Sequence, residues 1–453
     1  MTFPCYPEYK YSGVEWIGDI PAHWRIEPLK RSCSVFPSNV DKKSYEGQTP
    51  VRLCNYTDVY YNENILADMD FMPATATAEQ IEKFRLRAGD VIFTKDSETA
   101  DDIAIAAYVP HDIPGVICGY HLSMIRPGKG VDGSFIKRFF DSASAKAYFA
   151  VSANGLTRVG LSQYATDNVP TPLPELSEQT QIARFLDHET ARIDALIEEQ
   201  QRLIELLKEK RQAMISHAVT KGLDPSVPMK DSGVEWLGEV PAHWQVLAIK
   251  RFFRMVADPA PENNDFELLS VYTEIGVRPR KELEQKGNKA STTDGYWRVK
   301  KGDIVVNKLL AWMGAVGYSD YDGVTSPAYD ILRPSRKLSP KFYHYIFRGK
   351  PAQQEFKRWS RGIMEMRLRL YFDELGRILM PFPPLEEQEK IVAFIEAMET
   401  KFEALSQEAS EQVRLLSERR SALISAAVTG KIDLRDWQPP AGTPAPIREE
   451  ETA

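Results

Sequence analysis

The sequence predicts an α+β protein in which two α/β globular domains, in a pseudo-two-fold arrangement, are joined by two long antiparallel coiled-coil helices. Three observations predict this fold. A thirteen-residue phrase occurs twice, further segments of the first half return in the same order in the second half, and each half ends in a long stretch without Pro or Gly. The chain therefore contains an internal duplication in the order globule, helix, globule, helix.

The repeated phrase is the strongest of these signals. "SGVEWIGDIPAHW" begins at Ser12 and "SGVEWLGEVPAHW" begins at Ser232, and 12 of 20 positions are identical between 12–31 and 232–251. Three later matches follow in order, which are "AGDVIFTK" (88–95) with "KGDIVVNK" (301–308), "LSMIRP" (122–127) with "YDILRP" (329–334), and "LSEQTQIARFL" (from 176) with "LEEQEKIVAFI" (from 385). The spacing between copies drifts from 220 to 209 residues, as expected when loops vary in length and elements persist.

The globules have the local pattern of mixed α/β structure. Short runs rich in β-branched and aromatic residues, "DVIFT", "DIAIAAYV", "DIVVN" and "YDILRP", are bounded by Gly, Asp and Pro and predict strands. The segment 134–153 has apolar residues at helical spacing and predicts a helix.

The joining segments predict long helices. The first runs from Glu178 to Val219, where its 42 residues would span roughly 63 Å, and Ser177 is a candidate cap for its start. The apolar residues of the two stretches follow alternating steps of four and three, which is the a/d seam of a coiled coil. They are Ile182, Leu186, Ile193, Leu196, Leu203, Leu207 and Met214 in the first, and Ile391, Ile395, Met398, Phe402, Leu405, Leu416 and Leu423 in the second.

The order of the segments constrains how these helices meet. If a pseudo-two-fold axis exchanges the globules, one helix leaves the first globule for the second and the other returns, so the pair is antiparallel. The end of the second helix near Thr429 must then lie near Ser12. We therefore expect the repeated phrase to be the place where each globule receives an arriving helix.

Composition narrows the class of protein. The net charge is −7, hydrophobic residues make up 43%, and no apolar run approaches the ~20 residues that span a bilayer. The start lacks the layout of a signal peptide. The four cysteines lie in the first 118 residues without a C-x-x-C pair, which favours free, reduced thiols. These features predict a cytoplasmic protein with no membrane partner.

Catalytic and metal-binding signatures are missing from the sequence. There is no G-x-x-x-x-G-K-[ST] phosphate loop, no G-x-G-x-x-G fingerprint and no Asp/Asn-Pro-Pro-Tyr/Phe tetrapeptide of amino-methyltransferases. His23 and His243 recur in the repeat, but no Cys or carboxylate stands at triad or ligand spacing beside both. We therefore predict hydrogen-bonded structural histidines, and neither a catalytic nor a metal site.

Local charge indicates a polyanionic ligand. Residues 341–369 carry a net charge of +6 and their counterpart 134–163 a net charge of +3, inside an acidic chain. Both contain a glycine loop followed by polar or basic side chains, "NGLTRVGLSQY" and "RGIMEMRLRLY", of the types that bind base edges and phosphates. Lys95 and Lys308, each at a strand end after Gly-Asp, are further candidates for phosphate contacts.

The same residues resemble a known family. The opening "SGVEWIGDIPAHW", the helix "PLPELSEQTQIARFLDHETARIDALI" and the late segment "LISAAVTGKIDLRDWQPP" are similar to the specificity (S) subunits of Type I restriction-modification systems over essentially the whole chain. The resemblance implies a target-recognition domain at 1–173, a spacer helix at 174–222, a second recognition domain at 223–381 and a second spacer helix at 382–431. The proline-rich composition of 438–453 predicts a disordered tail, and the division of the chain assigns 432–453 to it.

The resemblance also implies partners and site residues. Each recognition domain would read one half of a split double-stranded DNA target, and the helices would recruit two modification (methyltransferase) subunits and, in the full complex, two restriction subunits. Whether the exposed side of the helices or the globules hold the modification subunits stays open at this stage. S-adenosylmethionine, ATP and Mg would then belong to those partners, with no cofactor bound by this chain. The loop positions implied for DNA contact are Asn154, Arg158, Ser162, Gln163, Arg358, Arg361, Arg367 and Arg369.

Two other functions stay open at this stage. One is an enzyme that acts alone as a methyltransferase or nuclease, which activity of the purified chain on DNA would reveal. The other is a coiled-coil adaptor protein that does not bind DNA, for which binding to duplexes would show no salt dependence.

Overall fold

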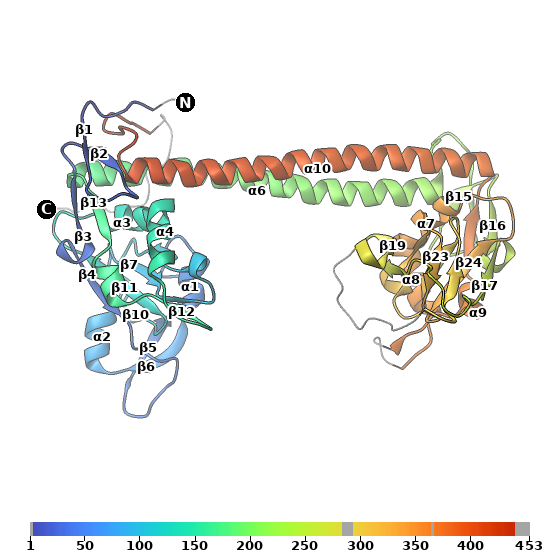
Figure 1. The fold of residues 1–453 in the computed structure, drawn as a ribbon, viewed down its shortest axis with the longest axis horizontal. Coiled ribbons are helices and arrows are strands. Elements are labelled where there is room, and N and C mark those ends of the chain that lie inside the picture. The colour runs from blue at the N-terminus through green and yellow to red at the C-terminus, as the bar shows by residue number, and fades with distance from the viewer. Residues whose placement is uncertain (1–2, 283–292, 364–366, 440–453) are drawn as a thin grey trace. The chain divides into compact units, whose positions relative to one another are not determined.

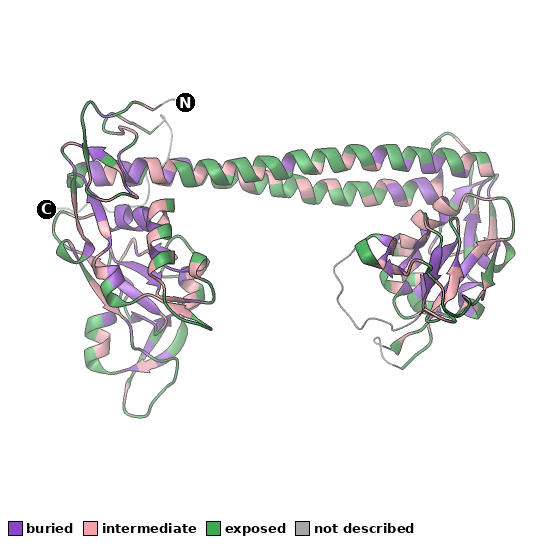
Figure 2. Ribbon diagram, in the orientation of Figure 1, coloured by how far each residue is buried: buried purple, intermediate pink, exposed green. Residues whose placement is uncertain are grey.

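The computed structural model describes residues 3–282, 293–363 and 367–439. The chain divides into two compact units, formed by residues 1–200 with 411–453 and by residues 201–410. Each unit holds one globule and parts of both long helices (Figure 1). The strands at the centre of each globule are buried, whereas the middle parts of the long helices are largely exposed (Figure 2).

The first globule is built on a four-stranded antiparallel sheet. Its order is β4 (Cys33–Pro37), β11 (Leu122–Pro127), β7 (Val91–Thr94), β9 (Ala106–Tyr108). All residues of β7 are buried, as the run "DVIFT" predicts. The strand predicted from "DIAIAAYV" is shorter, because Ala104 takes a left-handed φ of 61°.

Smaller sheets complete this globule. In a mixed sheet, β10 (Val116–Cys118) lies parallel to β5 (Thr49–Cys54), which pairs antiparallel with β6 (Met72–Ala76). The two-stranded pairs are β1 (Tyr9–Tyr11) with β2 (Asp19–Pro21), β3 (Arg25–Pro28) with β13 (Pro170–Leu173), and β8 (Asp96–Ser97) with β12 (Val159–Gly160).

The second globule repeats the central sheet. Its order is β17 (Phe253–Val256), β24 (Tyr329–Pro334), β21 (Ile304–Asn307), β22 (Val316–Tyr318), which matches the first sheet strand for strand. The runs "DIVVN" and "YDILRP" form β21 and β24, as predicted. The two-stranded pairs are β14 (Met229–Asp231) with β15 (Glu239–Pro241), β16 (Gln245–Ala248) with β25 (Leu379–Phe382), β18 (Leu269–Tyr272) with β19 (Gly276–Pro279), and β20 (Trp297–Val299) with β23 (Gly323–Thr325).

The shorter helices surround these sheets. In the first unit they are α1 (Tyr56–Tyr60), α2 (Ala78–Phe84), α3 (Gly133–Asp141), α4 (Ala143–Ser152) and α5 (Gln163–Asp167), and in the second α7 (Pro340–Arg348), α8 (Lys350–Trp359) and α9 (Phe372–Leu375). The single helix predicted over 134–153 is wrong. Ser142 has an extended ψ of 145° and its side chain accepts a hydrogen bond from the Ala145 backbone N–H, so it ends α3 and caps α4.

The long helices are α6 (Leu176–Lys221) and α10 (Leu385–Val428). In the first unit the start of α6 packs against the end of α10, with Phe185 and Val428 in one core. In the second unit the end of α6 packs against the start of α10, with Val219 and Ile391 in one core. The two helices therefore run antiparallel within each unit. Ser177 is not a cap, since α6 already begins at Leu176.

The predicted seam is wrong at three positions. Leu196, Leu203 and Leu405 are 45%, 42% and 49% exposed. Ile197 and Ile204, one residue further along α6, are half-buried in their place. The buried and half-buried row of α6 is Ile193, Ile197, Gln200, Ile204 and Leu207. Its steps of four and then three reverse the predicted order, so Leu196 and Leu203 face solvent.

The repeated phrase receives the ends of the long helices, as predicted. After α10, Lys431 Nζ donates a hydrogen bond to the Asp19 carbonyl at 2.6 Å, and Gly430 at φ 71° packs so closely on Pro21 that a Cβ would lie 2.3 Å away. After α6, Lys221 Nζ donates to the carbonyls of Leu237 and Glu239. Glycine ends each helix in the left-handed conformation that helix C-termini favour.

The segment after α10 corrects one predicted boundary. Leu434 is buried, and the Trp437 ring contacts Phe185 edge-on with centroids 5.3 Å apart. The disordered tail therefore does not begin at 432, because residues 432–437 bury apolar side chains in the first core. Residues 440–453 of the predicted tail lie outside the described residues.

Candidate nucleic-acid interface

A pinned loop follows α4 in the first unit. Asn154 and Gly160 exchange two backbone hydrogen bonds of 3.0 and 2.9 Å, which close the loop 154–160. Gly155 has a φ of 147° and lies so close to the opposite strand of the loop that a Cβ would be 1.9 Å from the Arg158 carbonyl oxygen. The Leu161 backbone N–H then donates to the Lys95 carbonyl at 2.9 Å, so the loop is fixed to the end of β7.

The second unit has a loop closed in the same way by different residues. Arg361 and Arg369 exchange two backbone hydrogen bonds of 2.9 Å, and Gly362 at φ 155° would place a Cβ 2.6 Å from the Arg367 carbonyl oxygen. The Leu370 backbone N–H donates to the Lys308 carbonyl at 2.9 Å. Residues 364–366 of this loop lie outside the described residues. Each globule thus presents a closed loop held by the strand end that carries its predicted lysine.

The predicted lysines have internal partners. Lys95 Nζ donates to the Ser38 carbonyl at 3.1 Å and lies 4.8 Å from the Tyr120 ring centroid. Lys308 Nζ donates to the Pro327 carbonyl at 2.9 Å and lies 3.4 Å from the Asp330 carboxylate. Their main chains position the loops, and phosphate contact by their ammonium groups stays a prediction.

The predicted polar residues of the first loop differ in role. Arg158 and Gln163 are exposed, and the Asn154 side chain donates to the Ser152 carbonyl at 2.9 Å. The Ser162 hydroxyl accepts a hydrogen bond from the Ala165 backbone N–H, which caps α5. Arg158 and Gln163 are therefore the residues of this set whose exposed side chains stay available for a ligand.

The predicted arginines of the second unit also divide into two kinds. Arg358 lies 3.4 Å from Glu355 and 3.8 Å from Glu235, and Arg361 pairs with Glu374. Arg367 and Arg369 are exposed, and no ion pair joins either of them to a carboxylate within the described ranges. The available positive charge of this loop therefore rests on Arg367 and Arg369.

Aromatic side chains beside the first loop were missed by sequence reasoning. Tyr56 and Tyr60 stack with centroids 5.5 Å apart, and Tyr61 is 75% exposed. Burial raises the pKa of Tyr56, which lies within electrostatic range of the Arg158 guanidinium. The signal was present as "YTDVYY" (56–61), but three tyrosines in six residues fit a packed helix equally well.

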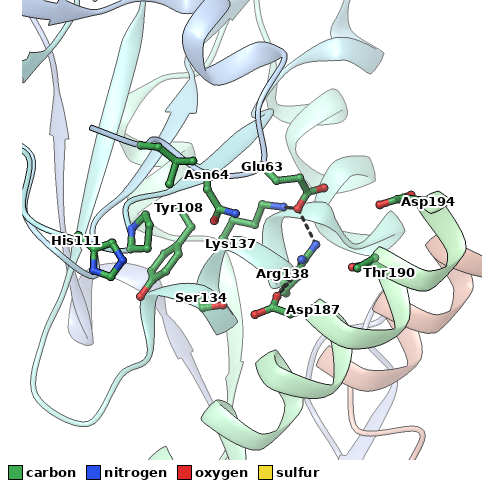
Figure 3. A pocket seen from close by; sticks show the side chains of 13 residues that line it. Glu63, Asn64, Tyr108, His111, Ser134, Lys137, Arg138, Asp187, Thr190 and Asp194 are labelled. Carbon is green, nitrogen blue, oxygen red and sulfur yellow. Dashed lines mark hydrogen bonds and ion pairs between the residues drawn. The ribbon is translucent and has the colours of Figure 1, made fainter. Parts of the chain in front are cut away.

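A charged cleft anchors the first globule to the long helices (Figure 3). The cleft holds about 450 Å³ and is lined by Glu63, by α3 and by α6. Lys137 and Arg138 are 3% and 7% exposed, and both pair with Glu63, which also accepts from Arg420 of α10 at 2.6 Å. Arg138 reaches Asp187 of α6 at 2.9 Å.

The charges in this cleft stabilise one another. Burial opposes ionisation of Glu63, but the cations of Lys137 and Arg138 outweigh it and hold the pKa of its carboxyl well below the ordinary value. Removal of one partner would leave a buried charge unpaired, and the cluster joins the first globule to α6 through Asp187 and to α10 through Arg420. Sequence reasoning could not find it, since Glu63 is more than 70 residues from its partners.

The predicted structural histidines are confirmed. His23 Nε2 lies 2.8 Å from Glu178 and His243 Nε2 lies 2.8 Å from Glu387, so each joins the repeated phrase to the start of a long helix. The four cysteines are free thiols, as predicted. The described ranges contain no cluster of His, Cys, Asp and Glu that could hold a metal ion. Among the described helices, none is long and apolar enough to cross a membrane.

Comparison with known proteins gives one consistent result. The family model for the Type I restriction modification DNA specificity domain matches residues 41–207 and 241–414. A protein of Methanocaldococcus jannaschii named as the MjaX type I restriction enzyme specificity subunit is 22% identical over 448 residues, 95% of this chain and 98% of its own. The EcoBI specificity subunit of Escherichia coli is 23% identical over 319 residues, 66% of this chain and 67% of its own.

Solved structures share the fold. The HsdS subunit of Thermoanaerobacter tengcongensis has a TM-score of 0.54 at 17% identity, covering 91% of this chain and 98% of its own. A chain from a study of complex assembly and conformational transition in the type I R-M system has a TM-score of 0.63 at 19% identity, covering 91% and 99%. With two specificity-domain matches over most of its length, the chain belongs to the specificity subunits of type I restriction-modification systems.

Proposed function

We propose that this chain is the DNA-reading subunit of a Type I restriction-modification complex, in which each globule reads one half of an asymmetric bipartite target. The observation that carries the proposal is the pair of pinned loops. They share their glycine, their closing hydrogen bonds and their attachment to a strand end, but their exposed side chains differ. Two related readers of different half-sites need this combination of a common frame and divergent contact residues.

We propose the division of labour that the family implies. Methylation with S-adenosylmethionine, and cleavage with ATP and Mg, would belong to two modification subunits and two restriction subunits, and this chain would act in the cytoplasm without catalysis of its own. The proposed division of the chain is 1–173, 174–222, 223–381 and 382–431. The exposed leucines of α6, at 196, 203 and 206, are the surface proposed to bind the modification subunits.

We further propose that α6 and α10 form a coiled-coil ruler that sets the distance between half-sites. Each is one uninterrupted helix, of 46 and 44 residues. One heptad added to both would lengthen the ruler by about 10 Å, and the unread DNA spacer by about three base pairs. A methylation assay on targets of graded spacer length measures this, and an unchanged optimum would refute the ruler.

DNA binding is tested with the purified full chain and fluorescent 40-base-pair duplexes at increasing KCl. We expect affinity to fall steeply with salt, because phosphate contacts release counterions. Arg158→Ala and Arg367→Ala should weaken binding, whereas Arg184→Ala on α6 and Arg377→Ala after α9 serve as exposed controls. A flat salt response would favour an adaptor that does not bind DNA. Methyl transfer to DNA by the chain alone would favour an independent enzyme.

A further inference from the structure

Two aliphatic side chains stand fully in solvent at matching places in the two units. Leu156 and Ile363 are 104% and 101% exposed, more than any other large hydrophobic residue in the described ranges, where Val151 follows at 87%. Each comes directly after the glycine of its pinned loop, Gly155 or Gly362. A duplicated chain has therefore kept its two most exposed apolar side chains at one structural position, although the residues themselves differ.

The loops hold these side chains outward. In each loop the glycine lies against the carbonyl of an arginine on the opposite limb, Arg158 or Arg367, too closely for any Cβ. The closing hydrogen bonds and the bond to the strand end fix the two limbs. The fully exposed side chains of Leu156 and Ile363 bury no area, so they contribute nothing to folding. A side chain in this position is free to make an apolar contact with another molecule.

We propose that Leu156 and Ile363 are apolar wedges that enter the base stack of the target DNA, one in each half-site. This inference rests on the proposed DNA-reading function. Aliphatic side chains inserted at a base step partly unstack it and bend the duplex. An exposed arginine follows each tip within four residues, Arg158 after Leu156 and Arg367 after Ile363, so the tip stands where a phosphate backbone would be held.

The surroundings favour DNA over a protein partner. A stable protein interface buries about 800 Å² on each side around a contiguous apolar centre. The first tip offers one aliphatic side chain within a polar and basic loop, in which Asn154, Thr157 and Arg158 are exposed beside Leu156. In the second loop Ile363 has the same place after its glycine, and residues 364–366 lie outside the described residues. A single base step matches the size of that contact. Because insertion is easiest at flexible steps, each wedge would also impose a base preference where no hydrogen bond is made.

The test begins with selection from duplexes that contain a random 30-base-pair region, using the wild-type full chain, Leu156→Ala and Ile363→Ala. Leu66→Ala and Leu379→Ala, exposed at 43% and 40% away from the loops, are the matched controls. We expect Leu156→Ala to lose the preference at one or two adjacent base pairs of one half-site, and Ile363→Ala to do so only in the other. Each should bind the selected duplex about tenfold to one hundredfold more weakly.

A second measurement reports insertion itself. With 2-aminopurine at the affected step of the selected duplex, wild-type chain should raise the fluorescence by unstacking the base, and Leu156→Ala should not. If the wild-type chain binds and both variants keep the same base preference, affinity and fluorescence response, the wedges are overturned and the DNA-reading function stands. Loss of methyltransferase co-purification without a change in DNA binding would assign the tips to a protein contact and also overturn them. Failure of the wild-type chain to bind duplexes would refute the function and the wedges together.

Discussion

Replacement of Glu178 by Ala should loosen the attachment of the first globule to α6. The Glu178 carboxylate accepts hydrogen bonds from Tyr6 Oη at 2.6 Å, His23 Nε2 at 2.8 Å and Trp24 Nε1 at 3.0 Å. Tyr6 and Trp24 are buried. Burial and the bond to Glu178 hold the pKa of Tyr6 well above its ordinary value, so its hydroxyl stays a donor. The Ala variant would leave two buried donors without an acceptor.

The size of the effect follows from those two donors. An unsatisfied buried donor costs about 1–3 kcal/mol, so the two donors left by Glu178→Ala should lower the free energy of local opening by about 2–6 kcal/mol. Glu387 provides the matched control, because it is also the third residue of its helix and helix-end effects cancel. It accepts only from the half-exposed His243, and Trp244 Nε1 already lacks a partner among the described residues. Glu387→Ala should cost about 1 kcal/mol or less.

Hydrogen–deuterium exchange measures the effect of each substitution at its own attachment point, with the other attachment point of the same chain as an internal reference. Amide exchange around Trp24 should accelerate by about 30-fold or more in Glu178→Ala, with peptides around Trp244 unchanged. In Glu387→Ala, exchange around Trp244 should rise less than tenfold. Equal acceleration of exchange in the two variants would refute the reasoning, because the number of buried donors bound to each glutamate would then not determine the loss of stability.

Three further outcomes are expected. Arg158→Ala and Arg367→Ala should each reduce the slope of log affinity against log salt by about 1, measured by anisotropy titration at several KCl concentrations. Burial and the cation of Arg348 lower the pKa of His344 to about 3, so between pH 6.5 and 3 only the unfolded state binds a proton at this residue. The free energy of unfolding should therefore fall with falling pH by up to about 1.4 kcal/mol per pH unit. Urea titrations of His344→Gln at several pH values should lack this component. Trp437→Ala should lower thermal stability of the first unit by about 2–3 kcal/mol, whereas a chain ending at Pro439 should match wild type.

Much of the fold follows from the duplication. Once "SGVEW…PAHW" and the long helices are matched, the order of segments requires the end of α10 near Ser12, and the contact of Lys431 with Asp19 agrees. Strands with continuous apolar runs, such as β7 and β21, were also predictable, because both of their faces are covered. These features depend on sequence patterns that are local or repeated.

Features decided by packing were not predictable. The break between α3 and α4 depends on whether Ser142 caps a new helix or continues the old one, and local propensity allows both. Sequence patterns could not tell which row of α6 faces inward, because Leu196 and its neighbour Ile197 have similar hydrophobicity. The distant partners of Lys137 and Arg138 lie on two segments, at Glu63 and at Asp187 of α6. In the candidate site, sequence reasoning placed the loops through their glycines and charges, but it could not tell which arginines have internal partners.

The way the two units differ extends the argument about function. Equivalent buried helices, α3 and α7, share Phe135/Phe342 and Phe140/Phe347, but α3 reaches the long helices with a buried arginine and α7 with Tyr345, which donates to Glu399 at 2.9 Å. The apolar frame is thus kept while the polar attachments have diverged independently. The proposed reading of two different half-sites needs this freedom, because loop side chains can change only if the frame that positions the loops does not depend on them. The pinned loops meet that condition, since their shape rests on backbone hydrogen bonds and one glycine, and the polar side chains around their tips differ between the two units.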